Sequence, residues 1–81
     1  LSPAFGKGTK KSYRAHYWML EGNYQKAMKL YLSFAPDTEV EKGKTWAAMN
    51  IANFDKFIDN DVEAERFLQL KEALKEEGWP I

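Results

Sequence analysis

The sequence contains no cysteine and a single histidine, and these two shortages exclude several kinds of chemistry. Without cysteine the chain has no disulfide framework, no thiolate metal site and no thiol nucleophile, and the redox compartment and the location in the cell stay open. A metal site would need His16 together with carboxylates from distant segments, so we predict no metal and no other cofactor. His16 also has no nucleophile elbow or other catalytic spacing around it, and we predict that the protein is not an enzyme.

The chain also lacks a net charge and a long apolar run. Residues 1–40 hold six basic and three acidic side chains, whereas residues 41–81 hold six and nine. This asymmetry is typical of a solvated surface, and it also suits head-to-tail self-association or docking to a charged partner. The apolar runs are far shorter than the roughly 18 residues of a membrane-spanning helix. Since the chain starts at Leu1 rather than Met, we expect a processed or trimmed chain.

The apolar pattern predicts an all-α fold of four helices, arranged as two antiparallel helical hairpins. The first hairpin covers residues 12–35. Its helices are separated by Gly22, which suits the left-handed turn past a helix end, and by Asn23, a good N-cap. Residues 24–35 carry the clearest core stripe, and Pro36 ends this second helix because proline disfavours helical geometry in the residue before it.

The second hairpin is predicted to cover residues 39–78. The T-x-x-E spacing at residues 38–41 indicates a capping box for its first helix, unless Gly43 moves the start to residues 44–45. Short polar side chains at residues 59–61 mark the turn to its second helix. The predicted organisation is therefore an N-terminal arm over residues 1–11 and a helical domain over residues 12–81, ending in an apolar tail at residues 79–81 that folds back on the helices.

Part of the first hairpin resembles a tetratricopeptide repeat (TPR), a helical hairpin with small and aromatic residues at fixed spacing. The matching residues surround the turn: Ala15, Trp18, Gly22, Tyr24, Ala27 and Tyr31. Lys11 and Arg14 stand where the family has Trp and Leu, and Pro36 comes about three residues early. The second hairpin matches less well. The fold is therefore either TPR-like or a small helical bundle without repeat ancestry.

Two features indicate protein partners. The TPR-like layout implies a concave surface formed by the first helix of each hairpin, with these residues toward a partner: Ser12, Tyr13, His16, Met19, Lys44, Ala48 and Ile51. Aromatic residues make up 15% of the chain, more than so small a core can bury, and Trp18, Trp46 and Trp79 are expected to form an exposed apolar patch. The predicted partner-binding residues are Tyr13, His16, Trp18, Trp46, Ile51 and Trp79.

A basic cluster lies before and within the start of the first helix. It consists of Lys7, Lys10, Lys11 and Arg14, with Tyr13 and Tyr17 interleaved. Such a cluster can contact phosphates and stack a base, and at a helix start it opposes the helix dipole, which favours an acidic partner. The function most favoured is a non-catalytic protein–protein interaction module or small helical adaptor. The alternatives are a structural or accessory subunit of a larger assembly and, less favoured, nucleic-acid binding through the basic arm.

Overall fold

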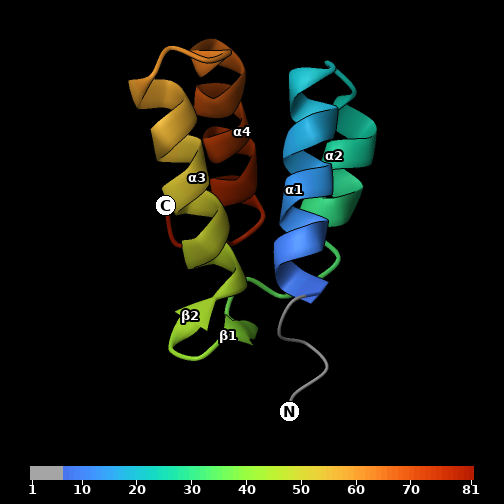
Figure 1. The fold of residues 1–81 in the computed structure, drawn as a ribbon, viewed down its shortest axis with the longest axis vertical. Coiled ribbons are helices and arrows are strands. Elements are labelled where there is room, and N and C mark those ends of the chain that lie inside the picture. Colours follow the sequence, from blue (N-terminus) through green and yellow to red (C-terminus); the bar gives the residue numbers. More distant parts are fainter. Residues whose placement is uncertain (1–6) are drawn as a thin grey trace.

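The computed structural model describes residues 7–81, which fold into two helical hairpins (Figure 1). A short β-hairpin connects them in the sequence. The elements in chain order are α1 (Lys7–Leu20), α2 (Tyr24–Tyr31), β1 (Glu39–Glu41), β2 (Lys44–Thr45), α3 (Trp46–Asp59) and α4 (Ala64–Glu76). Helices α1 and α2 run antiparallel, as do α3 and α4, and the β-hairpin lies at the end where α1 and α3 begin. The predicted all-α fold of two antiparallel helical hairpins is confirmed.

The turn between α1 and α2 is built by two neighbouring residues. Gly22 has a φ of +83°, in the left-handed region that glycine enters without steric cost. Its amide donates to the carbonyl of Met19 at 3.1 Å, and the amide of Asn23 donates to that of Trp18 at 2.8 Å, which satisfies the end of α1. The Asn23 side chain accepts the Lys26 amide at 3.2 Å and caps α2. The predicted turn of the first hairpin is therefore confirmed.

The N-terminal arm predicted over residues 1–11 is wrong for residues 7–11, which form the first turns of α1. The remainder of the predicted arm, residues 1–6, lies outside the described residues. The reason for the longer helix is a tertiary contact that no local pattern reveals. Gly8 is buried against Val40 of β1, and a Cβ placed on Gly8 would lie 2.7 Å from the Val40 Cβ. The start of α1 is thus held against the β-hairpin.

Replacing Gly8 with alanine is expected to destabilise the protein by about 1–3 kcal/mol, although alanine is the better helix former. The added methyl group would meet the Val40 Cβ, an atom attached to the backbone that cannot rotate away. Chemical denaturation followed by circular dichroism measures the loss. The exposed Lys10→Ala substitution in the same helix is the control and should change the free energy of unfolding by less than about 0.5 kcal/mol. A Gly8→Ala variant more stable than the parent would contradict the contact.

The capping box predicted at residues 38–41 is wrong, because this segment enters strand β1, which pairs antiparallel with β2. Gly43 lies in the turn between the strands with a φ of +75°, a left-handed conformation that interrupts a helix. Helix α3 therefore begins at Trp46. Its N-cap is Thr45, whose hydroxyl accepts the Ala48 amide at 3.1 Å. The alternative start that Gly43 allowed is confirmed.

The core between the two hairpins is mainly aromatic. Phe54 of α3 lies 5.3 Å from Tyr31 of α2 and 5.7 Å from Phe67 of α4, measured between ring centroids. Trp79, in the segment after α4, stacks on Phe54 at 6.4 Å. Buried aromatic rings remove large areas from water, so these contacts hold the two hairpins together. The predicted return of the apolar tail onto the helices is confirmed.

Candidate functional site

The residues predicted to bind a partner do not share one surface. Tyr13 is 65% exposed. Trp18 and Ile51 are half-buried, whereas the other three are buried: His16, Trp46 and Trp79. The prediction of an exposed patch of three tryptophans is therefore wrong for two of its members, and His16 does not reach the surface as a partner-binding residue would.

Trp46 and Trp79 are buried because each has a defined place in the core. The indole N–H of Trp46 donates to the backbone carbonyl of Tyr31 at 2.7 Å, and its ring meets Phe34 edge-on at 5.1 Å. Trp79 packs against the rings of Tyr31 and Phe54. The number of aromatic residues in a sequence does not say which rings complete a core and which cover its outside.

His16 lies inside a buried polar network that connects α1, α2 and α3. Its Nδ1 atom lies 2.7 Å from the Tyr31 hydroxyl, and its Nε2 atom lies 3.0 Å from the Ser12 hydroxyl. The Asn53 amide nitrogen approaches Nε2 at 3.1 Å. The Ser12 hydroxyl donates to the Asn50 side-chain oxygen at 2.5 Å. The side chains of Ser12, His16 and Tyr31 are therefore all hydrogen-bonded, as buried polar groups require.

One tautomer of His16 agrees with the hydrogen bonds of both hydroxyl groups. Because the Ser12 hydroxyl donates to Asn50, its oxygen is free to accept the proton of Nε2. Nδ1 then carries no proton and accepts from the Tyr31 hydroxyl. In this tautomer Nε2 does not accept from the Asn53 amide, which is a close neighbour of the ring and not a donor to it. The Asn50 amide continues the chain by donating to the Trp46 carbonyl at 2.9 Å. The network therefore runs from α2 through α1 to the start of α3.

The network is poorly suited to catalysis, although Ser12 and His16 lie within hydrogen-bond distance of each other. Burial lowers the pKa of His16 from 6.5 to about 4, so the imidazole is neutral at pH 7 and a weak base. Ser12 is 1% exposed and its proton is engaged by Asn50, so its oxygen is not presented to a substrate. Burial also raises the pKa of Tyr31. The chemistry that this arrangement supports is structural hydrogen bonding between helices.

Residues that commonly bind metal ions are dispersed in the described part of the chain. Among residues 7–81, no three His, Asp or Glu side chains lie close enough together to hold a metal ion. His16, the imidazole that the sequence offers, has neighbours on both ring nitrogens. Within the same residues, no helix combines the length and the apolar character needed to cross a membrane.

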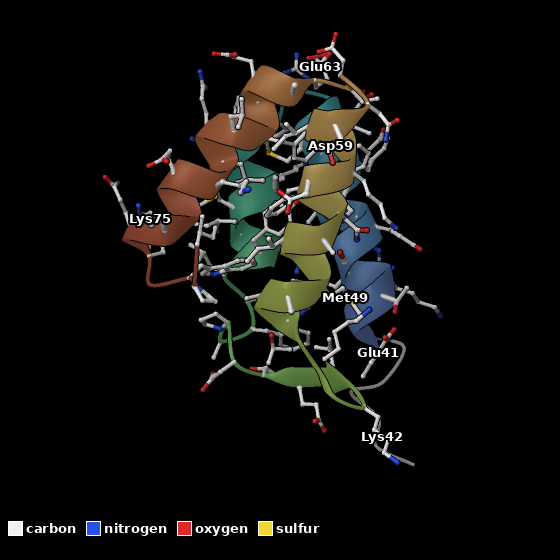
Figure 2. All side chains as sticks on the ribbon, turned by 90° about the vertical axis from the view of Figure 1, so that its left-hand side faces the viewer. Glu41, Lys42, Met49, Asp59, Glu63 and Lys75 are labelled. Carbon is white, nitrogen blue, oxygen red and sulfur yellow. The ribbon has the colours of Figure 1, made fainter. Side chains whose placement is uncertain are left out.

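A groove of about 170 Å³ lies between α1 and α3. Its lining comes from α1, the β-hairpin and α3, namely Thr9, Ser12, Tyr13, Glu41, Lys44, Met49, Ala52, Asn53 and Lys56. Figure 2 shows Glu41 and Met49 at the lower end of α3, beside the first turns of α1. The Thr9 hydroxyl donates to Glu41 at 3.4 Å, and the Lys44 ammonium lies 3.9 Å from the same carboxylate. This end of the groove is therefore polar, and Met49 supplies an apolar part.

No family model, curated protein or solved structure matches the chain. The groove is therefore interpreted from its own geometry and from the residues that line it.

The concave surface implied by the TPR-like layout corresponds only partly to this groove. Ser12, Tyr13 and Lys44 line the groove, as that layout implies. His16 and Met19 are buried and do not line the groove. The α3 side of the groove is formed by Met49, Ala52, Asn53 and Lys56 rather than by Ala48 and Ile51. The first helix of each hairpin contributes, but the face of α3 that meets the groove is displaced around the helix.

Exposed aromatic side chains continue along α1 beyond the groove. Tyr13, Tyr17 and Leu20 follow one another at four and three residues, which places them on one side of the helix. Tyr17 is 53% exposed and meets the Trp18 ring edge-on at 4.9 Å. Contiguous exposed apolar side chains are common at protein interaction surfaces. We call Tyr13, Tyr17 and Leu20 the α1 stripe.

Two residues that sequence reasoning missed, Asn50 of the buried network and Asn53 of the groove, have a recognisable signal. Asn50 and Asn53 flank the predicted core positions Ile51 and Phe54 of α3. A polar side chain next to a core stripe indicates a buried hydrogen-bond partner, and both residues join the His16 network. The basic residues of the predicted arm lie on α1 instead, where Lys11 places its ammonium 4.0 Å from the Phe34 ring centroid.

Proposed function

We propose that this chain is a non-catalytic protein-interaction module that binds an extended segment of a partner protein along the α1 stripe and the adjoining groove. The observation that carries the proposal is the position of Tyr13, which is 65% exposed and also lines the groove. Tyrosine offers a large, amphipathic contact area at a small entropic cost, which is why it is enriched at binding hot spots. The TPR resemblance of the first hairpin supports the same assignment.

The size and lining of the groove favour a partner side chain over a small-molecule substrate. A volume of about 170 Å³ is below the roughly 300–1,000 Å³ of pockets that enclose small ligands. Met49 provides an apolar wall, whereas Asn53 and Lys56 can reach polar atoms of a peptide backbone or side chain. Two lining residues of the groove are held in place by buried contacts, because Ser12 and Asn53 both lie next to the His16 ring.

Affinity measurements on matched tyrosine variants test this function. Peptides are selected from a displayed random library on the immobilised chain, and the dissociation constant of the best binder is measured by fluorescence anisotropy. Tyr13→Ala should weaken binding at least tenfold, which corresponds to about 1.4 kcal/mol. Ala52→Arg, which fills the groove from an exposed position, should do the same. Tyr24→Ala, at an exposed tyrosine of α2 that lies outside the groove, is the control and should leave the affinity unchanged.

Equal affinities for the parent, Tyr13→Ala and Ala52→Arg would place the binding surface elsewhere and overturn the proposal. A loss at Tyr24→Ala alone would assign binding to the other side of the first hairpin. Because Tyr13 and Ala52 are exposed, neither substitution removes a core contact, and the variants are expected to keep the parent's unfolding curve.

A second candidate function is a subunit of a larger assembly, and the spread of exposed apolar side chains favours it. Tyr24 and Leu32 are exposed near α2, and Val62 and Leu68 near α4. A permanent assembly buries several such faces at once. An isolated chain that stays in solution and unfolds cooperatively would count against this candidate, whereas aggregation of the isolated chain would favour it.

A further inference from the structure

Positive and negative side chains are distributed unequally between the two helical hairpins, and the difference is larger than that between the two halves of the sequence. Residues 7–35 hold six basic side chains and one acidic side chain, whereas residues 46–78 hold four basic and eight acidic side chains. The first hairpin is therefore strongly positive and the second strongly negative, although the whole chain carries no net charge. Such a distribution gives one molecule two surfaces of opposite sign.

The positive charges gather over aromatic rings on one side of the first hairpin. The ammonium groups of Lys11 and Lys26 lie 4.0 Å and 4.2 Å from the ring centroids of Phe34 and Trp18. The first contact joins α1 to the turn after α2 and the second joins α2 to α1, both at typical cation–π distances. A hollow of about 450 Å³ beside the Lys11–Phe34 contact has four lining residues, Lys10, Lys11, Arg14 and Phe34. We call the cations Lys10, Lys11, Arg14 and Lys26 the basic face.

The cations of the basic face form no ion pair among residues 7–81. The ion pairs there involve Lys44, Arg66 and Lys71 instead. Helix α1 also has no acidic residue in its first turn, so the positive end of the helix dipole adds to these charges. A partner of opposite charge would relieve this repulsion.

The second hairpin offers a matching surface on α4. Glu65, Leu68, Glu72 and Glu76 follow one another at three or four residues, which places them on one side of the helix. All four are exposed, and Leu68 is 47% exposed although it is apolar. We call these four residues the acidic face. The acidic face thus has one apolar side chain, Leu68, among three carboxylates. The hollow of the basic face correspondingly has one aromatic ring, Phe34, among three cations.

We propose that copies of this chain associate head to tail, with the acidic face of one copy docked on the basic face of the next and Leu68 seated in the hollow that Phe34 lines. The two faces lie on different hairpins, so the contact is heterologous and leaves one free face at each end of a chain of copies. A second copy is favoured over a nucleic acid because the negative second hairpin repels a polyanion. A second copy, in contrast, brings balancing charges of both signs.

Sedimentation velocity with charge-reversed variants tests the proposal. The parent should sediment faster as its concentration rises to about 1 mM at low salt. It should return to a monomer at about 1 M NaCl, where charges are screened beyond about 3 Å. Lys10→Glu/Arg14→Glu should weaken association at least tenfold, because the basic face then carries two cations and two carboxylates and has lost its net positive charge. Glu65→Lys/Glu72→Lys should do the same, because both of its faces are then basic. An equimolar mixture of the two variants should associate again, since each retains the face that the other has lost.

The control is Lys42→Glu/Lys56→Glu, which changes the net charge as much as Lys10→Glu/Arg14→Glu does, at exposed positions outside both faces. It should associate as the parent does. A parent that stays monomeric at every salt and protein concentration would overturn the proposal. So would association that both double variants retain, or a mixture that stays monomeric. Retention of the parent on heparin without self-association would assign the basic face to a polyanion instead.

Variants at Tyr13 and at the basic face distinguish head-to-tail association from peptide binding. Tyr13→Ala should associate as the parent does, because Tyr13 belongs to the groove and not to the hollow of the basic face. Lys10→Glu/Arg14→Glu should in turn bind the selected peptide with the parent's affinity. A variant that loses both self-association and peptide binding would show that one surface serves both. This result would overturn the proposed contact between the acidic and basic faces.

Discussion

Replacing Trp46 with alanine is expected to lower the free energy of unfolding by about 3–5 kcal/mol, the range measured for buried aromatic residues in protein cores. Trp46 is fully buried at the first position of α3, where its indole N–H bonds to the Tyr31 carbonyl and its ring packs on Phe34. The substitution leaves a cavity and an unpaired carbonyl between the hairpins. Since a small domain has a total stability of about 5–15 kcal/mol, this loss removes a large part of the stability of the protein.

Urea denaturation followed by far-ultraviolet circular dichroism measures this loss. Trp46→Phe is the informative partner variant, because it keeps an aromatic ring but removes the hydrogen bond, and it should recover part of the stability. Trp18→Ala is the control, because Trp18 is half-buried under Lys26, and it should cost about 1 kcal/mol. A Trp46→Ala variant with the parent's stability and impaired partner binding would instead support the binding role expected from the sequence.

The protein is expected to lose about 3 kcal/mol of stability as the pH falls from 7 to 4, because His16 is buried in its neutral form. Burial lowers the pKa of His16 from 6.5 to about 4, and the side chain is 4% exposed, so solvent screens this effect little. Between these two pKa values the unfolded state binds a proton that the folded state does not. The stabilisation is therefore complete above pH 6.5, falls as the pH drops, and stops falling below about pH 4.

The free energy of unfolding, measured in urea at a series of pH values, tests this dependence. The range from pH 6.5 to 5 is the most informative, because carboxylates titrate mainly below it. His16→Gln is the control, because glutamine can hydrogen-bond within the network but does not titrate there. The variant should be less stable than the parent at pH 7 and nearly independent of pH down to pH 5. A parent that shows no slope in this range would mean that His16 accepts a proton in the folded state.

The first hairpin was predictable from the sequence because its turn is encoded locally. Gly22 and Asn23 form the end of α1 and the cap of α2 through hydrogen bonds within six residues of each other. The β-hairpin was missed because strands of three and two residues are too short to show an alternating pattern. Gly43 gave the one usable signal, since a left-handed turn at that position ends any helix begun before it.

The parts of the candidate site that the sequence did not reveal depend on contacts between distant segments. Gly8 contacts Val40 across more than thirty positions, and this contact extends α1 into the predicted arm. Asn53 reaches His16 over a similar separation and brings α3 to the groove. No local pattern encodes such distances. Tyr13 was predicted as a partner-facing residue through the TPR resemblance, and the structure leaves it 65% exposed.

The most direct test of the central claim is to map a bound peptide by nuclear magnetic resonance. Titration of the selected peptide into the isotope-labelled chain should shift the amide signals of Tyr13, Ala52, Asn53 and Lys56, which surround the groove between α1 and α3. Signals of α2 and α4, such as those of Tyr24 and Leu68, should stay in place. Shifts confined to α2 and α4, with the groove signals unchanged, would contradict the assignment of this groove as the binding site.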